Sequence, residues 1–494
     1  GLLAAVVVAL YACDDAAAAP TAFPIINGES DNSTIASRAP VSLRIPLTPV
    51  GEDLYYIASA DIGTNPRPFN LVMDTGTSDF WVYAEACPQR GRHNGVSPAA
   101  SPQMLVDPAS RWSILYNEQS RASGIMARDT IHFGGVSVPG YLFGMAGSAS
   151  GIITQSIEDG LLGFAPQRGS RMGIPSMAQV LARNGVIPAP ITGWFLSRRR
   201  DGGRGGELAL GTPNEAKFKV ETLTPPIPNI GGIYWSVPVT GAKINGVPIP
   251  AVGNIAAVLD SATTLILMPH HDATAINQQL RAIYDATTEN FYIPCNTNLQ
   301  VSFTIDNQDW AIDPRDLVAT RRMRPDGYCQ SNIQGASDLS NTWMLGATFM
   351  KNVYAVMNYD TDEIQLARIY CTVKEYLDEW KNGVMRELPK SSTGDATGSY
   401  SPETATMHPT ASSPTHPASL SPPPLLRLAL LLVPASALAR LPPSLPQCTR
   451  IPSAHAHAHC HMHAHRWRPT PLSSLPNQHA EKTKDARDGT AAAA

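Results

Sequence analysis

Short runs of alternating apolar and polar residues, separated by Gly, Pro and Asn, cover residues 40–373. This spacing is typical of an all-β protein, because successive side chains of a strand face opposite sides of a sheet. Helical periodicity is sparse in this region and is clearest over residues 272–286. The clearest predicted strands are YYIASADIG (55–63), FNLVMD (69–74), GIMARDTIHFGG (124–135), GELALG (206–211) and YWSVPV (234–239).

The two ends of the chain have different patterns. Residues 1–19 combine an apolar stretch with a cluster of small residues, which predicts the remnant of a secretory signal peptide. Residues 20–39 then form a short propeptide or linker, and apolar residues on one helical face predict a helix over 374–388. Residues 389–494 are rich in Pro, Ser, Ala and His and contain no Phe, so we expect a disordered low-complexity tail.

Composition excludes several classes of protein. Apolar residues make up 43% of the chain, enough for a sizeable core, and the net charge of −4 excludes a basic nucleic-acid binder. No run of 18 uncharged apolar residues exists, which excludes a protein with several membrane spans. The seven cysteines include no CxxC pair, which argues against zinc ribbons and thioredoxin-like redox sites.

Two segments of the tail are similar to functional motifs, but we do not expect either of them to function as one. The apolar stretch 425–441 follows a Ser/Thr/Pro spacer, as in a lipid-anchor signal, but more than fifty residues follow it. Membrane anchoring is therefore only an alternative. The histidine-rich tract 455–465 could bind metals but offers no fixed geometry, so no metal site and no cofactor are expected.

An internal repeat determines the predicted fold. LVMDTGTSDFWV contains Asp74, and AVLDSATTLILM contains Asp260, 186 residues later. A second pair of motifs, DGLLGF with Gly163 and WMLGAT with Gly346, recurs in the same order 183 residues apart. Two motifs repeated at nearly the same offset indicate two duplicated lobes.

The repeated aspartates suggest a specific chemistry. An Asp that ends an apolar strand normally avoids burial, but two of them on symmetry-related turns can face each other and share one proton. The charged member can then activate a water molecule while the neutral member protonates a substrate carbonyl. Hydroxyls at Thr75 and Ser261 can lock the turns together, and those at Thr77 and Thr263 can hold the outer carboxylate oxygens. The small residues that allow a close approach of the turns are Gly76 and Ala262.

Over residues 40–373 the chain resembles the secreted, fungal-type pepsin-like aspartic proteases. The resemblance rests on the motifs DTGTS, DFWV, WSILY, DGLLGF, DSATT and WMLGATFMKNVYAVMNYD, and on the cysteine pair Cys295 and Cys329. It implies a bilobal all-β fold with a central active-site cleft, an N-terminal lobe over 40–225 and a C-terminal lobe over 226–373. The implied protein is a monomeric, secreted endopeptidase that acts on extended polypeptides at acid pH, with vacuolar or cell-surface location as alternatives.

The resemblance also implies roles for single residues. A hairpin flap would carry Tyr116, whose hydroxyl would hydrogen-bond the indole of Trp81, and Cys295 and Cys329 would form a disulfide. Glu118 and Glu158 would lie near one substrate pocket and favour a Lys or Arg side chain there. Alternatively, both carboxylates point into solvent and the pocket prefers Phe or Leu. In that case its lining residues are Val72, Ile152 and Leu161.

Three departures from the family pattern leave a second function open. Ala262 stands where the family usually has Gly, and its Cβ could crowd the catalytic pair. The flap reads YNEQS, so Asn117 and the residues after it replace the usual flap glycines. The segment before the first strand is short and contains only Arg38 as a basic residue, which makes control by a Lys-rich propeptide doubtful. The alternative function is therefore a catalytically weakened protease-like protein that binds peptides.

Overall fold

The structure is a computed structural model that describes residues 39–116, 120–202, 205–250, 252–339 and 341–370. The predicted signal peptide, the helix over 374–388 and the tail over 389–494 lie outside these ranges. Within them, strands predominate and form three sheets. All five strands that the sequence predicts most clearly are present, as β2, β3, β6, β10 and β12.

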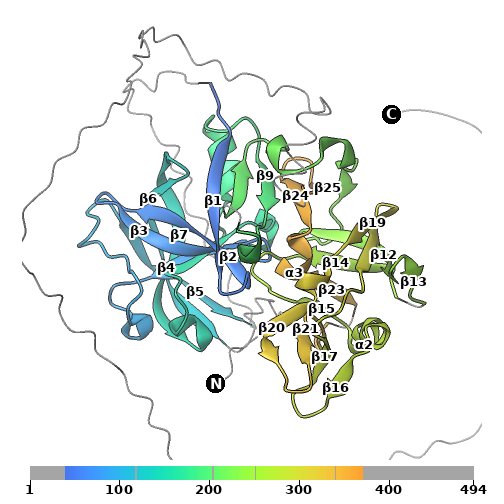
Figure 1. The fold of residues 1–494 in the computed structure, drawn as a ribbon. Helices are drawn as coiled ribbons and strands as arrows, with labels where there is room; N and C mark the ends of the chain where they lie inside the picture. The colour runs from blue at the N-terminus through green and yellow to red at the C-terminus, as the bar shows by residue number, and fades with distance from the viewer. Residues whose placement is uncertain (1–38, 117–119, 203–204, 251, 340, 371–494) are drawn as a thin grey trace, which may run out of the picture. The chain divides into compact units, whose positions relative to one another are not determined.

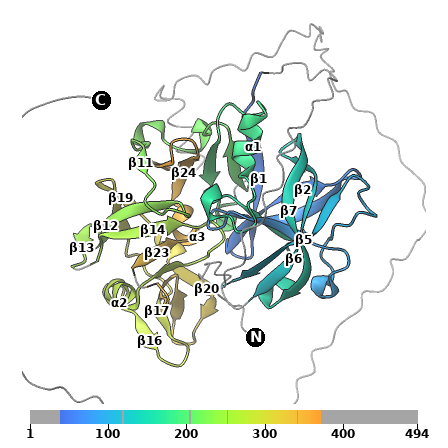
Figure 2. The same ribbon diagram turned by 180° about the vertical axis from the view of Figure 1, so that it is seen from behind.

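The largest sheet of the described residues has 13 strands in the order β11-β25-β24-β9-β10-β1-β2-β3-β8-β4-β7-β6-β5. Figure 1 shows its early strands on one side of the molecule, with β24 beside β9 near the centre, and Figure 2 shows the same arrangement from behind. Its strands are β1 (Leu43–Val50), β2 (Tyr55–Ile62), β3 (Arg67–Asp74), β4 (Phe80–Tyr83), β5 (Leu105–Leu115), β6 (Arg121–Phe133), β7 (Val136–Ser150), β8 (Gly160–Gly163), β9 (Ile191–Phe195), β10 (Gly206–Leu210), β11 (Ile227–Pro228), β24 (Val353–Asn358) and β25 (Glu363–Arg368).

Two further sheets come from the second half of the described chain. An eight-stranded sheet contains β12 (Ser236–Ile244), β13 (Val247–Pro248), β14 (Ile255–Leu259), β15 (Ile266–Met268), β18 (Val301–Ile305), β19 (Gln308–Ala311), β22 (Ile333–Gly335) and β23 (Thr342–Leu345). A four-stranded sheet contains β16 (Ile283–Asp285), β17 (Asn290–Pro294), β20 (Val318–Met323) and β21 (Tyr328–Ser331). Cys295 follows β17, and its disulfide to Cys329 joins β17 to β21, as expected.

Helices are few in the described residues. They are α1 (Met177–Arg183), α2 (His270–Gln279) and α3 (Ala347–Met350), with short 3₁₀ turns at Pro88–Arg90, Ile152–Thr154, Gln167–Gly169, Arg199–Asp201, Glu215–Lys217, Val220–Thr222 and Pro314–Asp316. None of the helices described here is long and apolar enough to cross a membrane.

The helix predicted over 272–286 is wrong in its second half. The observed helix α2 ends at Gln279, and Arg281 adopts a left-handed φ of 61°, which a continuing helix cannot accommodate. Ile283–Asp285 then pairs with Asn290–Pro294 as an antiparallel hairpin. Ile and Tyr fit a strand well, and pairing with a neighbouring strand outweighed the local helical periodicity.

The internal repeat corresponds to a repeated arrangement of strands. β3 lies parallel to β8, so that Asp74 is paired with Gly163. In the second half, β14 lies parallel to β23, and the backbone N–H of Asp260 donates to the carbonyl of Leu345, just before Gly346. Each aspartate therefore ends a strand that is held against the second repeated motif.

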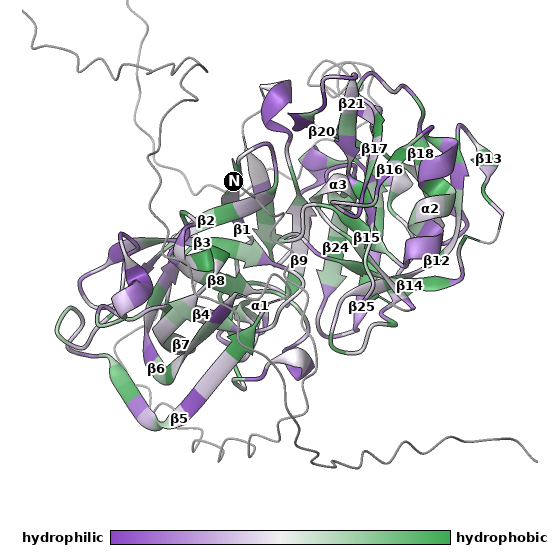
Figure 3. Cartoon of the chain, turned by 90° about the horizontal axis from the view of Figure 1, so that it is seen from below, coloured by the Kyte–Doolittle hydropathy of each residue, from purple (hydrophilic) through white to green (hydrophobic). Residues whose placement is uncertain are grey.

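The sheets also connect the two predicted lobes. β24 and β25 belong by number to the range 226–373, yet β24 pairs antiparallel with β9. The hydrophobic core is continuous across this junction and includes the fully buried Trp194 and Trp235. Figure 3 shows hydrophobic residues along the inner strands and hydrophilic ones on the peripheral loops. The largest sheet therefore crosses the lobe boundary predicted at residue 225.

Candidate active site

Asp74 and Asp260 lie at the ends of the two repeated strands, and both are fully buried. Their turns are very close. A Cβ placed on Gly76 would lie 2.7 Å from Cγ of Asp260, which no real side chain tolerates. Glycine at position 76 therefore lets the first turn approach the second carboxylate.

Reciprocal hydrogen bonds lock the two turns together. The backbone N–H of Thr75 donates to Oγ of Ser261 at 3.1 Å, and the backbone N–H of Ser261 donates to Oγ1 of Thr75 at 2.9 Å. The Thr75 hydroxyl donates onward to the carbonyl of Leu259 at 2.8 Å, and the Ser261 hydroxyl donates to that of Met73 at 2.7 Å. The two hydroxyls thus join the strand ends into one near-symmetric unit.

Each carboxylate is held by its own turn. Asp74 accepts from the backbone N–H of Gly76 at 2.7 Å and from the Thr77 hydroxyl at 3.1 Å. Asp260 accepts from the backbone N–H of Ala262 at 2.9 Å and from the hydroxyl of Thr263 at 2.7 Å. The backbone N–H of Thr263 adds a third hydrogen bond to Asp260 at 3.1 Å. Both side chains are therefore fixed in orientation before any substrate arrives.

Ala262 keeps the hydrogen bond that its Cβ could have removed. Its backbone lies outside the left-handed region, so its side chain causes no backbone strain there. The residue is fully buried, and its N–H still donates to Asp260. The structure thus retains the carboxylate contacts of the second turn despite the extra methyl group.

The two carboxyl groups differ in their tendency to ionise. Burial raises the pKa of Asp74 well above its usual range, and the charge of Asp260 raises it further. Burial also raises the pKa of Asp260, but hydrogen bonds from Thr263, Ala262 and the Asp74 carboxyl oppose that rise. Because the negative charge of one carboxyl group opposes ionisation of the other, the two groups titrate as one pair that holds a single proton over a range of pH.

Trp81 and Tyr116 are joined by a hydrogen bond, as the resemblance implied. Nε1 of Trp81 donates to the Tyr116 hydroxyl at 2.7 Å, and both side chains are buried. Tyr116 directly follows β5, and the indole of Trp81 packs against Tyr83 edge-on. The flap residues Asn117 and Glu118, which the sequence analysis assigned to substrate binding, lie outside the described residues.

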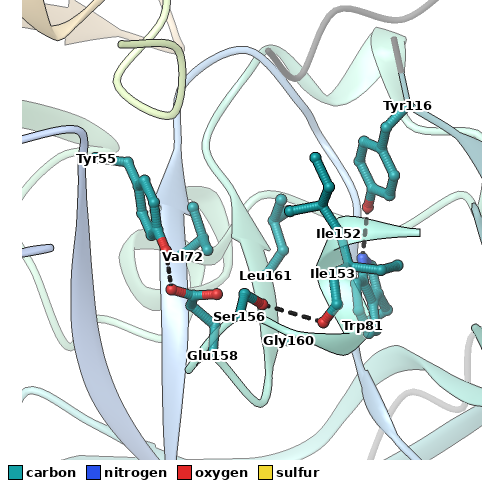
Figure 4. Close-up of a pocket in the computed structure, with 10 residues that line it drawn as sticks. All are labelled: Tyr55, Val72, Trp81, Tyr116, Ile152, Ile153, Ser156, Glu158, Gly160 and Leu161. Atoms are coloured by element: carbon teal, nitrogen blue, oxygen red, sulfur yellow. Dashed lines mark hydrogen bonds between the residues drawn. The ribbon is translucent and has the colours of Figure 1, made fainter. Parts of the chain in front are cut away.

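A pocket opens at Val72 of β3, the strand that ends at Asp74 (Figure 4). Val72 precedes Asp74 by two positions on β3, and Leu161 is its partner in the register of β8. Glu158 lies two positions before Gly160, where β8 begins. It is only 6% exposed, so the expectation that it points into solvent is wrong for this residue. The side chains and backbone that line the pocket are those of Tyr55, Val72, Trp81, Tyr116, Ile152, Ile153, Ser156, Glu158, Gly160 and Leu161.

Several of these residues were missed by the sequence analysis. Tyr55 opens β2, and its hydroxyl donates to Oε1 of Glu158, 103 residues along the chain. Ile153 and Ser156 belong to the turn that also carries Ile152. The turn residues could have been found by their nearness to Ile152 in sequence, whereas Tyr55 carries no local signal.

Comparisons with known proteins agree with this geometry. Residues 55–369 match the family described as eukaryotic aspartyl protease. The chain is 30% identical to rhizopuspepsin of Rhizopus chinensis over 330 residues, which is 66% of this chain and 81% of that protein. It is 31% identical to rhizopuspepsin-1 of Rhizopus niveus over 330 residues, 66% of this chain and 82% of that protein. It is 29% identical to the aspartic-type endopeptidase ctsD of Aspergillus fumigatus over 352 residues, which is 70% of this chain and 72% of that protein. The chain therefore belongs to the eukaryotic aspartyl proteases, the pepsin family of hydrolases.

Proposed function

We propose that this chain is an active endopeptidase that hydrolyses peptide bonds in extended polypeptides at acid pH. The observation that carries the proposal is the interlocked pair of turns, which holds two fully buried carboxyl groups close together. Secretion is part of the proposal, and its support is the apolar segment at residues 1–19.

In the proposed mechanism each carboxyl group has its own role. Asp260, the charged member, accepts a proton from a water molecule as the water oxygen attacks the scissile carbonyl carbon. Asp74 donates its proton to the carbonyl oxygen, so the intermediate carries two hydroxyl groups and no net charge. The proton now on Asp260 then passes to the amide nitrogen as the carbon–nitrogen bond breaks, and Asp74 recovers a proton from the intermediate.

Replacement of either aspartate by asparagine tests this proposal. Asp74→Asn and Asp260→Asn keep the shape of the side chain but remove the shared proton or its acceptor. We expect hydrolysis of an unfolded protein at acid pH to fall by about 10⁴-fold or more in each, the scale for a residue of a concerted catalytic unit. Asp326→Asn, at an exposed surface position, is the matched control. Near-full activity of Asp260→Asn would refute the assignment.

The pH profile is a second test of the same proposal. The pair works only while it holds one proton, so activity falls when Asp260 gains a proton and again when Asp74 loses its own. We expect a bell-shaped dependence of kcat/KM on pH with its maximum on the acid side of neutral. An optimum above pH 7 would contradict the mechanism.

The alternative, a protein that binds peptides without cleaving them, rested on crowding by Ala262. The retained hydrogen bond from the Ala262 N–H to Asp260 supports the active enzyme over that alternative. The unaltered protein in this experiment distinguishes the two functions, because a protein that only binds peptides shows no hydrolysis.

A further inference from the structure

The pocket at Val72 of β3 is apolar on most of its surface. It holds about 480 Å³ of empty space, part of it open to solvent. Aliphatic and aromatic side chains of Val72, Ile152, Leu161 and Trp81 form its walls (Figure 4). β3 carries both Val72 and Asp74, two positions apart, which places both residues on the same face of the strand.

One carboxylate interrupts this apolar lining. Glu158 is only 6% exposed, and the Tyr55 hydroxyl donates to its Oε1. Figure 4 shows its second oxygen directed away from Tyr55, toward the side of the pocket where Leu161 and Ser156 lie. Among the described residues, no basic side chain forms an ion pair with Glu158.

The neighbouring polar groups do not supply another charge. Asp159 is not among the residues that line the pocket, and it accepts hydrogen bonds from the backbone N–H groups of Asn70 and Asn94. The Ser156 hydroxyl donates to the carbonyl of Ile153. Burial, followed by the charge of Glu158, raises the pKa of the Tyr55 phenol, so Tyr55 remains a neutral donor. Glu158 is therefore the group that sets the charge of the pocket.

We propose that this pocket selects a basic side chain, Lys or Arg, at a position adjoining the scissile bond. Glu158 is the specificity-determining residue, and Tyr55 is a positioning residue that fixes its carboxylate. A long basic side chain places its methylene stem against the apolar walls and its charged end near the free oxygen of Glu158. An aliphatic side chain of the same length fills the same walls but leaves the buried carboxylate without a counterion. The inference rests on the proposed endopeptidase activity.

The test compares peptide substrates on the unaltered protein first. Two peptide series carry a single lysine or a single norleucine, moved in turn across the positions that flank the cleavage site. Assays run at about pH 5, above the ordinary pKa of a glutamate side chain of about 4.3. Mass spectrometry of the products locates each cut. At one flanking position we expect kcat/KM for lysine to exceed that for norleucine at least tenfold.

Variants then assign the preference to its residues. In Glu158→Gln, which keeps the shape and the acceptor for Tyr55, we expect the lysine-to-norleucine ratio to fall at least tenfold. In Tyr55→Phe we expect a fall of about threefold or more, because the carboxylate loses the hydrogen bond that orients it. The control Glu363→Gln makes the same change of charge on β25, outside the pocket, and should keep the ratio.

The outcomes separate this inference from the proposed function. Efficient cleavage of norleucine peptides with no preference for lysine at any position would overturn the inference and leave the endopeptidase activity intact. A preference for lysine that survives Glu158→Gln would overturn the role of Glu158. Cleavage of neither series by the unaltered protein would overturn both proposals.

Discussion

Asp316 is expected to be one of the most important charged residues for stability. It is 2% exposed and accepts hydrogen bonds from Nε and Nη2 of Arg198 at 2.8 and 2.7 Å. Nζ of Lys351 lies 3.0 Å from its other oxygen, and 3.8 Å from Asp53. Arg198 and Asp53 come from the first predicted lobe, whereas Asp316 and Lys351 come from the second. The cluster therefore joins the two halves of the chain through buried charges.

The substitution Asp316→Asn removes the central anion and keeps the size of the side chain. Lys351 would then keep Asp53, 3.8 Å away, and Arg198 would lose the carboxylate of its buried ion pair. Loss of one partner from a buried ion pair costs about 3–5 kcal/mol, because the remaining charge stays out of water without compensation. We therefore expect the free energy of unfolding to fall by about 3 kcal/mol or more near neutral pH.

The same loss should depend on pH in a defined direction. Burial alone would raise the pKa of Asp316, but the charges of Lys351 and Arg198 and their hydrogen bonds lower it below its usual value. A carboxyl group with a lowered pKa in the folded state stabilises the protein above its unfolded pKa of about 3.9 and loses that contribution as the pH falls. The difference between the parent protein and Asp316→Asn should therefore shrink below about pH 4.

Urea denaturation at about pH 6 and about pH 3, on either side of the ordinary pKa of aspartate, measures both effects. The control is Glu52→Gln, which breaks the exposed ion pair between Glu52 and Arg321, 2.8 Å apart, and should cost less than about 1 kcal/mol. A loss for Asp316→Asn no larger than that of the control would refute the reasoning. A difference that grows as the pH falls would refute the assigned direction of the pKa shift.

The remaining predictions concern the active site, and peptide hydrolysis measures each of them. Gly76→Ala should abolish activity, because its Cβ would lie 2.7 Å from Cγ of Asp260; retained activity would show that the turns can move apart. Ala262→Gly should leave kcat/KM equal or higher, because it only removes a methyl group beside the pair, and a large loss would contradict this. Tyr116→Phe removes the acceptor of the buried Trp81 N–H, which should lower kcat/KM about tenfold, and an unchanged value would argue against a role for that contact.

Local sequence patterns were sufficient for the fold class and for the prediction that the turns of Asp74 and Asp260 meet. The alternation of apolar and polar residues predicts strands, because the side chains of a strand alternate between two faces over a few consecutive residues. The repeat around Asp74 and Asp260 predicts a symmetric pair, because each motif is contiguous and carries its own turn residues. Both signals lie within short windows of the chain, so they can be read without knowing which segments meet.

Other features were decided only by the tertiary structure. Ile283–Asp285 has a helical pattern and became a strand because a partner strand lay beside it. β24 joins β9 across the division between the predicted lobes. Alternation shows which face of a strand is buried, but it does not show which strand will be its neighbour.

The contacts of the buried charged groups also depended on the tertiary structure. Glu158 is paired with Tyr55, which lies 103 residues away, and Arg198 is paired with Asp316, 118 residues away. Burial makes such a pairing necessary, since an isolated charge in the interior is costly, but no local pattern names the partner. The sequence alone therefore indicated the two repeated aspartates, whereas only the folded chain decided which distant residues become the partners of the buried charged groups.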